Sequence, residues 1–307
     1  FLGLREYRFI EAAADAAAPG ARAALDLIGG PGFGILRDPS VKVLRRGSEL
    51  VTVTPEVLEF MREPHALIIS KANVRSRVHR RAHMDYVGCK LFSKTGALQG
   101  ELRIVGLFTA TAYHRSTQTI PYIRHKVAQV RDAAGLDPNS HSGKAFANVL
   151  ESYPRDDLFQ IDAATLSDFA RQIAHLAERP RVRVLARADK FDRFVSILCF
   201  IPRDHYDTRA RTRIADYLAR VYNGRISAVY PYYPEGPLVR LHVIIGRDEG
   251  ETPKVAQSEL ERAVGEIITT WPDALRDRLV AERGDAGRAV ALRFAGAFSP
   301  AYRDTFS

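Results

Sequence analysis

Basic side chains are concentrated between Lys71 and Arg80, in a stretch that reads Lys-Ala-Asn-Val-Arg-Ser-Arg-Val-His-Arg. Arg81 follows, and the first acidic residue after it is Asp85. Cations this close together repel one another unless an anion or a water-rich surface relieves them. A guanidinium binds a carboxylate through its planar fork, and an amide can orient the bound group. The expected anion site comprises Lys71, Asn73, Arg75, Arg77, His79 and Arg80.

Two kinds of partner fit such a site. One is a small effector, an amino acid or a dicarboxylate, and the other is a set of acidic residues on a neighbouring domain. The sequence leaves both open. His79 and His83 stand four residues apart, but this spacing without a helix or a third ligand does not predict zinc. We expect no metal in this chain.

Other motifs that suggest catalysis fail on spacing or context. The run from Gly29 to Gly34 would place the third glycine of a dinucleotide fingerprint on Ile35, and it follows a helical stretch and precedes an extended one. Backbone geometry explains these glycines better. Ser140 and His141 with Asp137 resemble parts of a hydrolase, but a helix cap is the better interpretation because no nucleophile elbow is present. We therefore expect no catalytic residues.

Composition indicates an ordered protein of about two domains. The chain has 307 residues, of which 46% are hydrophobic, and has no apolar run long enough to span a membrane. It begins with Phe1, so we expect a segment of a longer protein. Cys89 and Cys199 are too few for a disulfide framework, which favours the cytoplasm. The net charge of +9 raises nucleic acid as an alternative partner, but a dispersed excess is more typical of a solvated surface.

The first third of the chain reads as a sheet with few helices. A strand over residues 1–10 precedes an alanine-rich stretch to Leu27. It is followed by a helix over 54–62, a strand over 66–70 and a hairpin over 83–112 that turns at residues 93–96. This order predicts a sensor-like α+β domain.

Residues 120–177 change to a helical period. The expected apolar stripes are Ile123, Val127 and Val130; Phe146, Val149, Leu150 and Tyr153; and Leu166, Phe169, Ala170 and Ile173. Asp162 is expected to cap the third helix. Between the last two stripes, residues 155–157 either latch two domains together or begin a new helix after Pro154.

Residues 180–270 give the clearest fold prediction. The expected order of elements is ββαββα. The strands cover 181–187, 194–201, 226–232 and 238–245, and the helices cover 206–222 and a stretch from 252 onward. A split β-α-β pair whose last strand is moved to the front has this order, as in a ferredoxin-like, ACT-type sandwich. Asn223-Gly224 is expected to end the first helix. Trp271 is expected on the apolar face of the second helix. Tyr230, Tyr232 and Tyr233 are expected at the end of a strand, packed on the helices of the same domain, although a docking role for these tyrosines stays open.

Several phrases of the sequence resemble the amino-terminal half of the large NAD-specific glutamate dehydrogenases of bacteria. They are the run 71–80, the stretches 84–88 and 106–109, Ser140–Ala145, Tyr153–Gln160, Glu178–Arg183, Phe200–Asp204 and Pro237–His242. They cover nearly the whole chain in one register. In that family, this half carries ACT-like and sensor-like domains, whereas the dehydrogenase core lies further toward the carboxyl terminus.

The resemblance implies a regulatory or assembly segment that is not catalytic by itself. The parent would oxidise L-glutamate to 2-oxoglutarate and ammonia with NAD in the cytoplasm, as a homo-oligomer in amino-acid catabolism. Other domains and subunits of the enzyme would be partners, and this segment would bind no cofactor. We expect a sensor-like domain over 1–115, a helical connector over 116–179, an ACT-like domain over 180–283 and the start of a further segment over 284–307.

Overall fold

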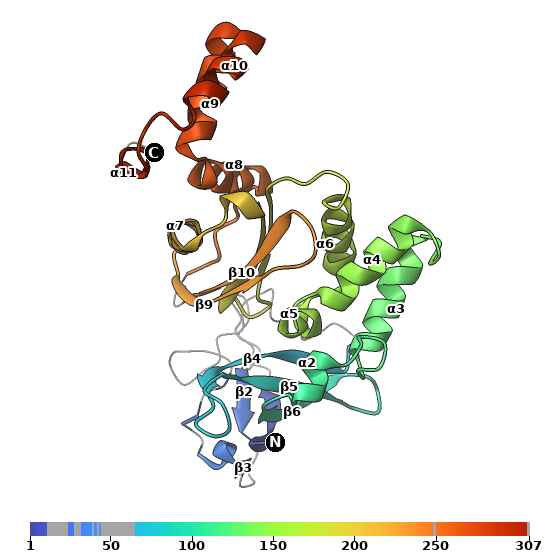
Figure 1. Ribbon diagram of the computed structural model, residues 1–307. Coiled ribbons are helices and arrows are strands. Elements are labelled where there is room, and N and C mark those ends of the chain that lie inside the picture. The colour runs from blue at the N-terminus through green and yellow to red at the C-terminus, as the bar shows by residue number, and fades with distance from the viewer. Residues whose placement is uncertain are drawn as a thin grey trace, which may run out of the picture. The chain divides into compact units, whose positions relative to one another are not determined.

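The computed structural model describes residues 1–10, 24–27, 32–38, 40, 41, 43, 65–247 and 250–305. It is an α+β protein with two antiparallel sheets, which confirms the expected fold class (Figure 1). The chain divides into two compact units. The first unit comprises Phe1–Ala177 together with Asp189–Arg193, and the second comprises Glu178–Ala188 with Phe194–Ser307. The four-part division expected from the sequence stays a prediction, and the helix expected over 54–62 lies outside the described residues.

The first unit contains a six-stranded sheet in which all described pairs are antiparallel. Its order is β2-β1-β6-β5-β4, and β3 also pairs with β1. The strands are β1 (Gly3–Ile10), β2 (Ala24–Leu27), β3 (Phe33–Gly34), β4 (Leu67–Arg75), β5 (His83–Phe92) and β6 (Leu98–Gly106). The β5–β6 hairpin was predicted, and it confirms that alternating residues identify half-buried strands.

Three local expectations were wrong. Strand β4 continues to Arg75, so half of the basic stretch lies inside a strand. Residues 24–27 form β2 on β1 rather than continuing a helix, because pairing to a neighbouring strand overrides the helical preference of alanine. After Gly34, residues 35–37 form a short 3-10 helix instead of a strand. Gly34 has a φ of 59°, and a Cβ there would lie 1.9 Å from the carbonyl oxygen of Leu2.

The described residues of the first unit also form the helices α2 (Ala110–His114), α3 (Ile123–Ala134), α4 (His141–Ser152), α5 (Arg155–Gln160) and α6 (Ala163–His175). Most members of each predicted stripe are buried on or directly after one helix, and on α3 the stripe of Ile123, Val127 and Val130 is buried throughout. Asp162 caps α6 by accepting a hydrogen bond from Thr165 N at 2.8 Å. Helix α5 begins directly after Pro154, because a proline ends the preceding helix and starts a new one.

The segment Asp189–Arg193 belongs to the first unit although it is distant in sequence. Arg193 is buried, and its Nε donates to Asp189 Oδ2 at 2.7 Å. The same guanidinium donates to Ser70 Oγ at 2.6 Å and to the carbonyl oxygen of Lys71. Phe191 meets the ring of Tyr86 edge-on at 6.4 Å. Buried charges are stable only with such complete pairing, so this segment is an integral part of the unit.

The second unit contains a four-stranded sheet of order β7-β8-β10-β9. Its elements are β7 (Arg183–Ala188), β8 (Phe194–Pro202), a 3-10 turn η2 (Arg203–His205), α7 (Thr208–Val221), β9 (Arg225–Tyr232), β10 (Leu238–Gly246) and α8 (Gln257–Ile268). Strand β10 lies between β8 and β9 in the sheet and is antiparallel to both. Strands β8 and β9 therefore run in the same direction, and α7 connects them along the chain. Leu218 on α7 and Val264 on α8 join one core with Ile197 and Val243 of the sheet, which confirms the ββαββα sandwich.

Two expectations for the second unit were wrong. Trp271 is the first residue of α9 (Trp271–Arg283), where a capping box at Thr270 starts a new helix. Helices α10 (Asp285–Phe294) and α11 (Pro300–Thr305) follow. Tyr230, Tyr232 and Tyr233 are 60%, 43% and 57% exposed, so they do not pack on their own helices. They lie at or just after the end of β9, which is an edge strand of the sheet.

Candidate effector or interface site

Lys71 is neutralised inside the first unit. It lies on β4 opposite Asp85 of β5, and its Nζ is 2.5 Å from Asp85 Oδ1 and 2.9 Å from Asp156 Oδ1. Burial lowers the pKa of Lys71, but the attraction of Asp156 and Asp85 outweighs it and raises the pKa above its ordinary value. The second oxygen of Asp85 accepts a hydrogen bond from Phe108 N at 2.5 Å. The charge of Lys71 is therefore already paired with Asp85 and Asp156 inside the unit, and its role is structural.

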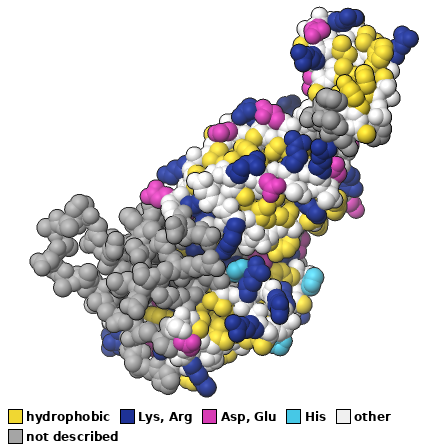
Figure 2. Space-filling view, turned by 90° about the vertical axis from the view of Figure 1, so that its left-hand side faces the viewer, with side chains coloured by type: hydrophobic (Ala, Val, Ile, Leu, Met, Phe, Trp, Pro, Cys, Tyr) yellow, Lys and Arg dark blue, Asp and Glu magenta, His cyan; other side chains and the backbone are white. Residues whose placement is uncertain are grey.

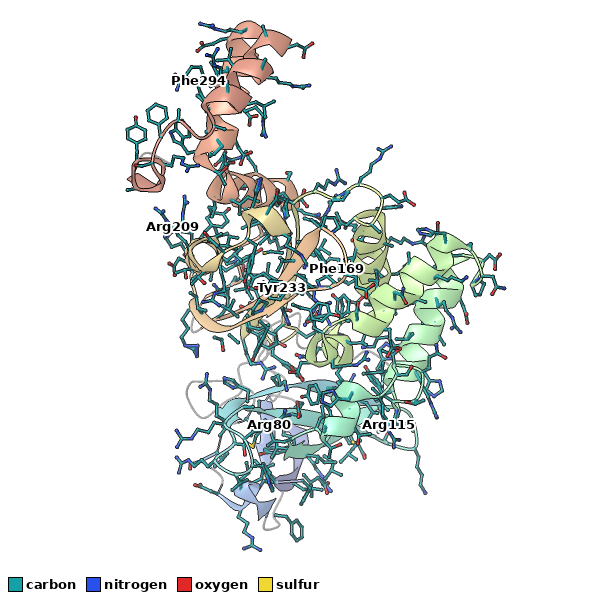
Figure 3. The ribbon with its side chains drawn as sticks, in the orientation of Figure 1. Arg80, Arg115, Phe169, Arg209, Tyr233 and Phe294 are labelled. Atoms are coloured by element: carbon teal, nitrogen blue, oxygen red, sulfur yellow. The ribbon has the colours of Figure 1, made fainter. Side chains whose placement is uncertain are left out.

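Tyr113 and Arg80 extend this group, which we call the Lys71 cluster (Lys71, Arg80, Asp85, Tyr113 and Asp156). Tyr113 Oη donates to Asp156 Oδ1 at 2.7 Å, and Arg80 Nη2 donates to Tyr113 Oη at 3.3 Å. Burial, together with the neighbouring Asp156, raises the pKa of Tyr113 to about 12. Its hydrogen bond to Tyr113 raises the pKa of Arg80. The cluster ties α2 and α5 to β4 and β5, and Figure 3 shows Arg80 beside these strands.

The remaining cations lie at the end of β4 and on the loop that follows it. Arg77, His79 and Arg81 are exposed, and none of them forms an ion pair with any residue that the structure describes. Ser76 shapes this loop: its N–H donates to the carbonyl oxygen of Ala82 at 2.9 Å, and its Oγ donates to that of Val78 at 2.8 Å. His79 adopts a φ of 61°. We call Arg75, Arg77, His79 and Arg81 the cationic loop; Arg80, which lies among them in the sequence, belongs to the Lys71 cluster.

The structure thus divides the predicted site residues into two sets. Lys71 and Arg80 belong to the Lys71 cluster, whereas Arg75, Arg77 and His79 belong to the cationic loop. Arg75 Nε donates to His83 Nε2 at 3.2 Å. Asn73 lies within β4, and its side chain is outside the described part of the chain.

Sequence reasoning missed three members of the cluster as site residues: Asp85, Tyr113 and Asp156. Asp85 carried a signal, because it is the first acid after the basic stretch and stands two residues into a strand. Asp156 was expected, with its neighbours at 155 and 157, either to latch two domains together or to begin a helix after Pro154, and α5 does begin at Arg155. Its contact with Lys71 joins α5 to β4 within one unit.

The other chemical motifs have structural roles in the described residues. Ser140 Oγ accepts a hydrogen bond from Gly143 N at 3.0 Å and so caps α4, which confirms the cap interpretation. His83 Nδ1 is 3.0 Å from the carbonyl oxygen of Ala72. Within the described ranges, no group of three or more His, Cys, Asp or Glu residues is arranged to hold a metal ion. No helix there is long and apolar enough to cross a membrane.

Comparison with known proteins identifies two stretches of the chain. Residues 120–179 match the family model described as glutamate dehydrogenase, helical motif 1, and residues 183–272 match the one described as glutamate dehydrogenase, ACT2 domain. These stretches contain α3 to α6 and the ββαββα sandwich, respectively. The second match agrees with the expected ACT-type fold.

Full-length relatives extend the similarity over most of the chain. The chain is 35% identical to the NAD-specific glutamate dehydrogenase of Halomonas elongata over 246 residues and 35% identical to that of Pseudomonas aeruginosa over 249. It is 30% identical to that of Mycobacterium tuberculosis over 249 residues. These alignments cover 77% to 81% of the chain but only 15% of each relative. The chain therefore spans about 15% of the length of the relatives it matches.

Proposed function

Because this chain belongs to the glutamate dehydrogenase family, as a segment of the large NAD-specific kind, we propose that it regulates and assembles such an enzyme without catalysing the reaction itself. The parent would oxidise L-glutamate to 2-oxoglutarate and ammonia with NAD. It would work in the cytoplasm as a homo-oligomer, in amino-acid catabolism. The cofactor and the reacting groups would belong to other parts of the parent.

The observation that carries this proposal is the contrast between the Lys71 cluster and the cationic loop. In the cluster, every charge has a partner inside the unit. In the loop, Arg77, His79 and Arg81 face solvent and form no ion pair with the described residues. The loop lies at and after the end of β4, which is an edge strand of the sheet. Exposed cations held in a fixed loop suit an acidic partner from outside the unit.

Two partners satisfy that requirement: acidic side chains of another domain or subunit, and a carboxylate effector. The first accounts for the loop most directly, because exposed arginines contribute to orientation and association through charge complementarity. The comparisons give no support to nucleic acid. On the face shown in Figure 2, Lys and Arg side chains are interspersed with acidic and apolar ones rather than gathered in one stripe.

The test uses the full-length parent enzyme carrying Arg77→Ala and Arg81→Ala. We expect dissociation into smaller species at lower salt than for the unaltered enzyme, measured by light scattering. Lys94→Ala is the matched control, because Lys94 is an exposed cation at the tip of the β5–β6 hairpin. Titration calorimetry with amino acids and dicarboxylates tests the effector. Unchanged assembly together with unchanged effector binding in the double variant would refute the proposed role of the loop.

A further inference from the structure

The helices that follow the ββαββα sandwich bury few of their side chains. The core of the sandwich extends to Ile268 of α8, and no described residue after Ile268 belongs to it. Helix α9 has no buried residue, and α10 buries only Gly287 and Ala291. Helices in proteins are stable mainly because an apolar face packs against other elements. The apolar face of α9 and α10 is therefore the feature that needs an explanation.

Helices α9 and α10 pack on each other at Gly287. A Cβ on Gly287 would lie 2.1 Å from the carbonyl oxygen of Leu279, so the two backbones approach closely there. Trp271, Leu275 and Leu279 follow one another at intervals of four residues and share one side of α9. All three are only half-buried. The contact with α10 thus leaves part of this apolar side uncovered.

Aromatic rings extend this apolar side. Phe294 of α10 is 46% exposed. Phe298 and Tyr302 are 40% and 41% exposed, and their rings stack at 4.7 Å. Both rings contact Trp271, with ring centres 5.0 and 6.3 Å away. In Figure 2, hydrophobic side chains gather at the upper end of the view, where α9 and α10 lie, with Lys and Arg side chains at the margin. We call this surface the hairpin patch; it comprises Trp271, Leu275, Leu279, Phe294, Phe298 and Tyr302.

The charged residues of α9 and α10 leave an excess of cations beside the hairpin patch. Each aspartate of these helices lies within 4.0 Å of an arginine of the same helix. Arg278, Arg283 and Arg293 form no ion pair with any residue that the structure describes, and the same is true of only one acid of the two helices, Glu282. A second copy of the patch would bring the same excess of positive charge. Acidic side chains on a different partner would complement it.

We propose that the hairpin patch binds an amphipathic helix from another part of the same parent polypeptide. This helix presents apolar residues at intervals of three or four, with Asp or Glu beside them. The relatives contain most of their length outside the stretch that this chain matches, so a parent of that kind has further segments to supply it. Helices that are neighbours in the sequence usually pack side by side, as α9 and α10 do.

Leu292 lies on the other side of α10 and is not part of the patch. It is 81% exposed. Each residue turns a helix by about 100°, so Leu292 and Phe294, two residues apart, point in nearly opposite directions. A single exposed leucine requires no partner. Leu292 therefore offers a matched control for Phe294 on the same helix.

The test compares hydrogen exchange of residues 285–294 in this chain and in the full-length parent enzyme, measured by mass spectrometry. We expect exchange to be slower in the parent by about tenfold or more, because burial of the Phe294 side chain suppresses local opening of α10. Phe294→Glu should abolish this difference, because it places a charge in an apolar contact. Dilution of the parent by about tenfold should leave the protection unchanged, because the binding helix belongs to the same polypeptide.

Leu292→Glu introduces the same charge on the other side of α10 and should leave the difference in exchange intact. Thermal denaturation of this chain checks that both variants fold, and each should shift the melting temperature by less than about 2 °C because both side chains are exposed. Equal exchange in this chain and in the parent overturns the inference, and so does an equal effect of the two variants. Protection that is lost on dilution assigns the patch to a second copy and overturns it as well.

This inference rests on the proposed function in one respect, because the partner helix belongs to the parent enzyme. The hairpin patch lies in the second unit, whereas the cationic loop lies in the first. Exchange of α10 reports on the patch, and dissociation of the loop variants reports on the loop. Failure of one proposal therefore leaves the other standing.

Discussion

Replacement of Lys71 by methionine should destabilise the first unit far more than an exposed lysine would. Asp85 is almost fully buried, with 4% of its side chain exposed, and Lys71 is its partner at 2.5 Å. Removing one member of a buried pair leaves an uncompensated charge, which costs about 3–5 kcal/mol. Phe108 N still donates to Asp85 after the change. Asp156 has 42% of its side chain exposed, so its share is below about 1 kcal/mol. We expect a loss of about 3 kcal/mol in the free energy of unfolding.

The assay is urea denaturation followed by circular dichroism, with hydrogen exchange of residues 83–109 to locate the effect in the first unit. Lys94→Met is the matched control, and it should change stability by less than about 0.5 kcal/mol. Adding Asp85→Asn to Lys71→Met should recover part of the loss, because the carboxylate charge is gone. A cost for Lys71→Met equal to that of the control would refute the assignment of Lys71 to a buried ion pair.

Three further predictions concern other parts of the two units. Gly143→Ala should destabilise α4 despite the better helix propensity of alanine, because the new Cβ would lie 2.0 Å from a backbone carbonyl oxygen. Gly265→Ala on α8 is the matched comparison: its Cβ would meet nothing within 4 Å, so this change should stabilise the protein by about 0.5–1 kcal/mol. Thermal denaturation of the two variants measures both effects. A maleimide should label the half-buried Cys89 in the native chain but not Cys199, whose burial raises its pKa to about 12; mass spectrometry would contradict this if both were labelled at equal rates. Asp162→Ala should cost about 1 kcal/mol at neutral pH. Although burial raises the pKa of Asp162, its hydrogen bonds lower it overall, so this cost should vanish as the pH falls through the folded-state value, and a cost unchanged by acid would argue against an ionised cap.

Elements with a strong period could be predicted from the sequence. The β5–β6 hairpin and the stripe of Ile123, Val127 and Val130 follow directly from periods of two and of 3.6 residues. The order ββαββα followed for the same reason. Residues 24–27 could not be predicted, because their strand exists only through pairing with β1. Composition favoured a helix there, and the partner strand decided the outcome.

The candidate site was predictable in position but not in pairing. The basic stretch identified β4 and its loop, yet the sequence cannot show which cations meet an acid. Asp156 lies 85 residues after Lys71 along the chain, and only the packing of α5 on β4 brings the two within 2.9 Å.

The discontinuous make-up of the first unit has a consequence for experiments that cut the chain. The matches to the family models suggest a division near residue 180, but a fragment that ends there would lack Arg193. Ser70 would then lose the guanidinium that binds it, and Tyr86 would lose the ring of Phe191. Such a fragment would expose part of an interior that the intact chain closes. The smallest independently stable piece of this protein therefore has to extend past Arg193, and the two units should be studied as one polypeptide.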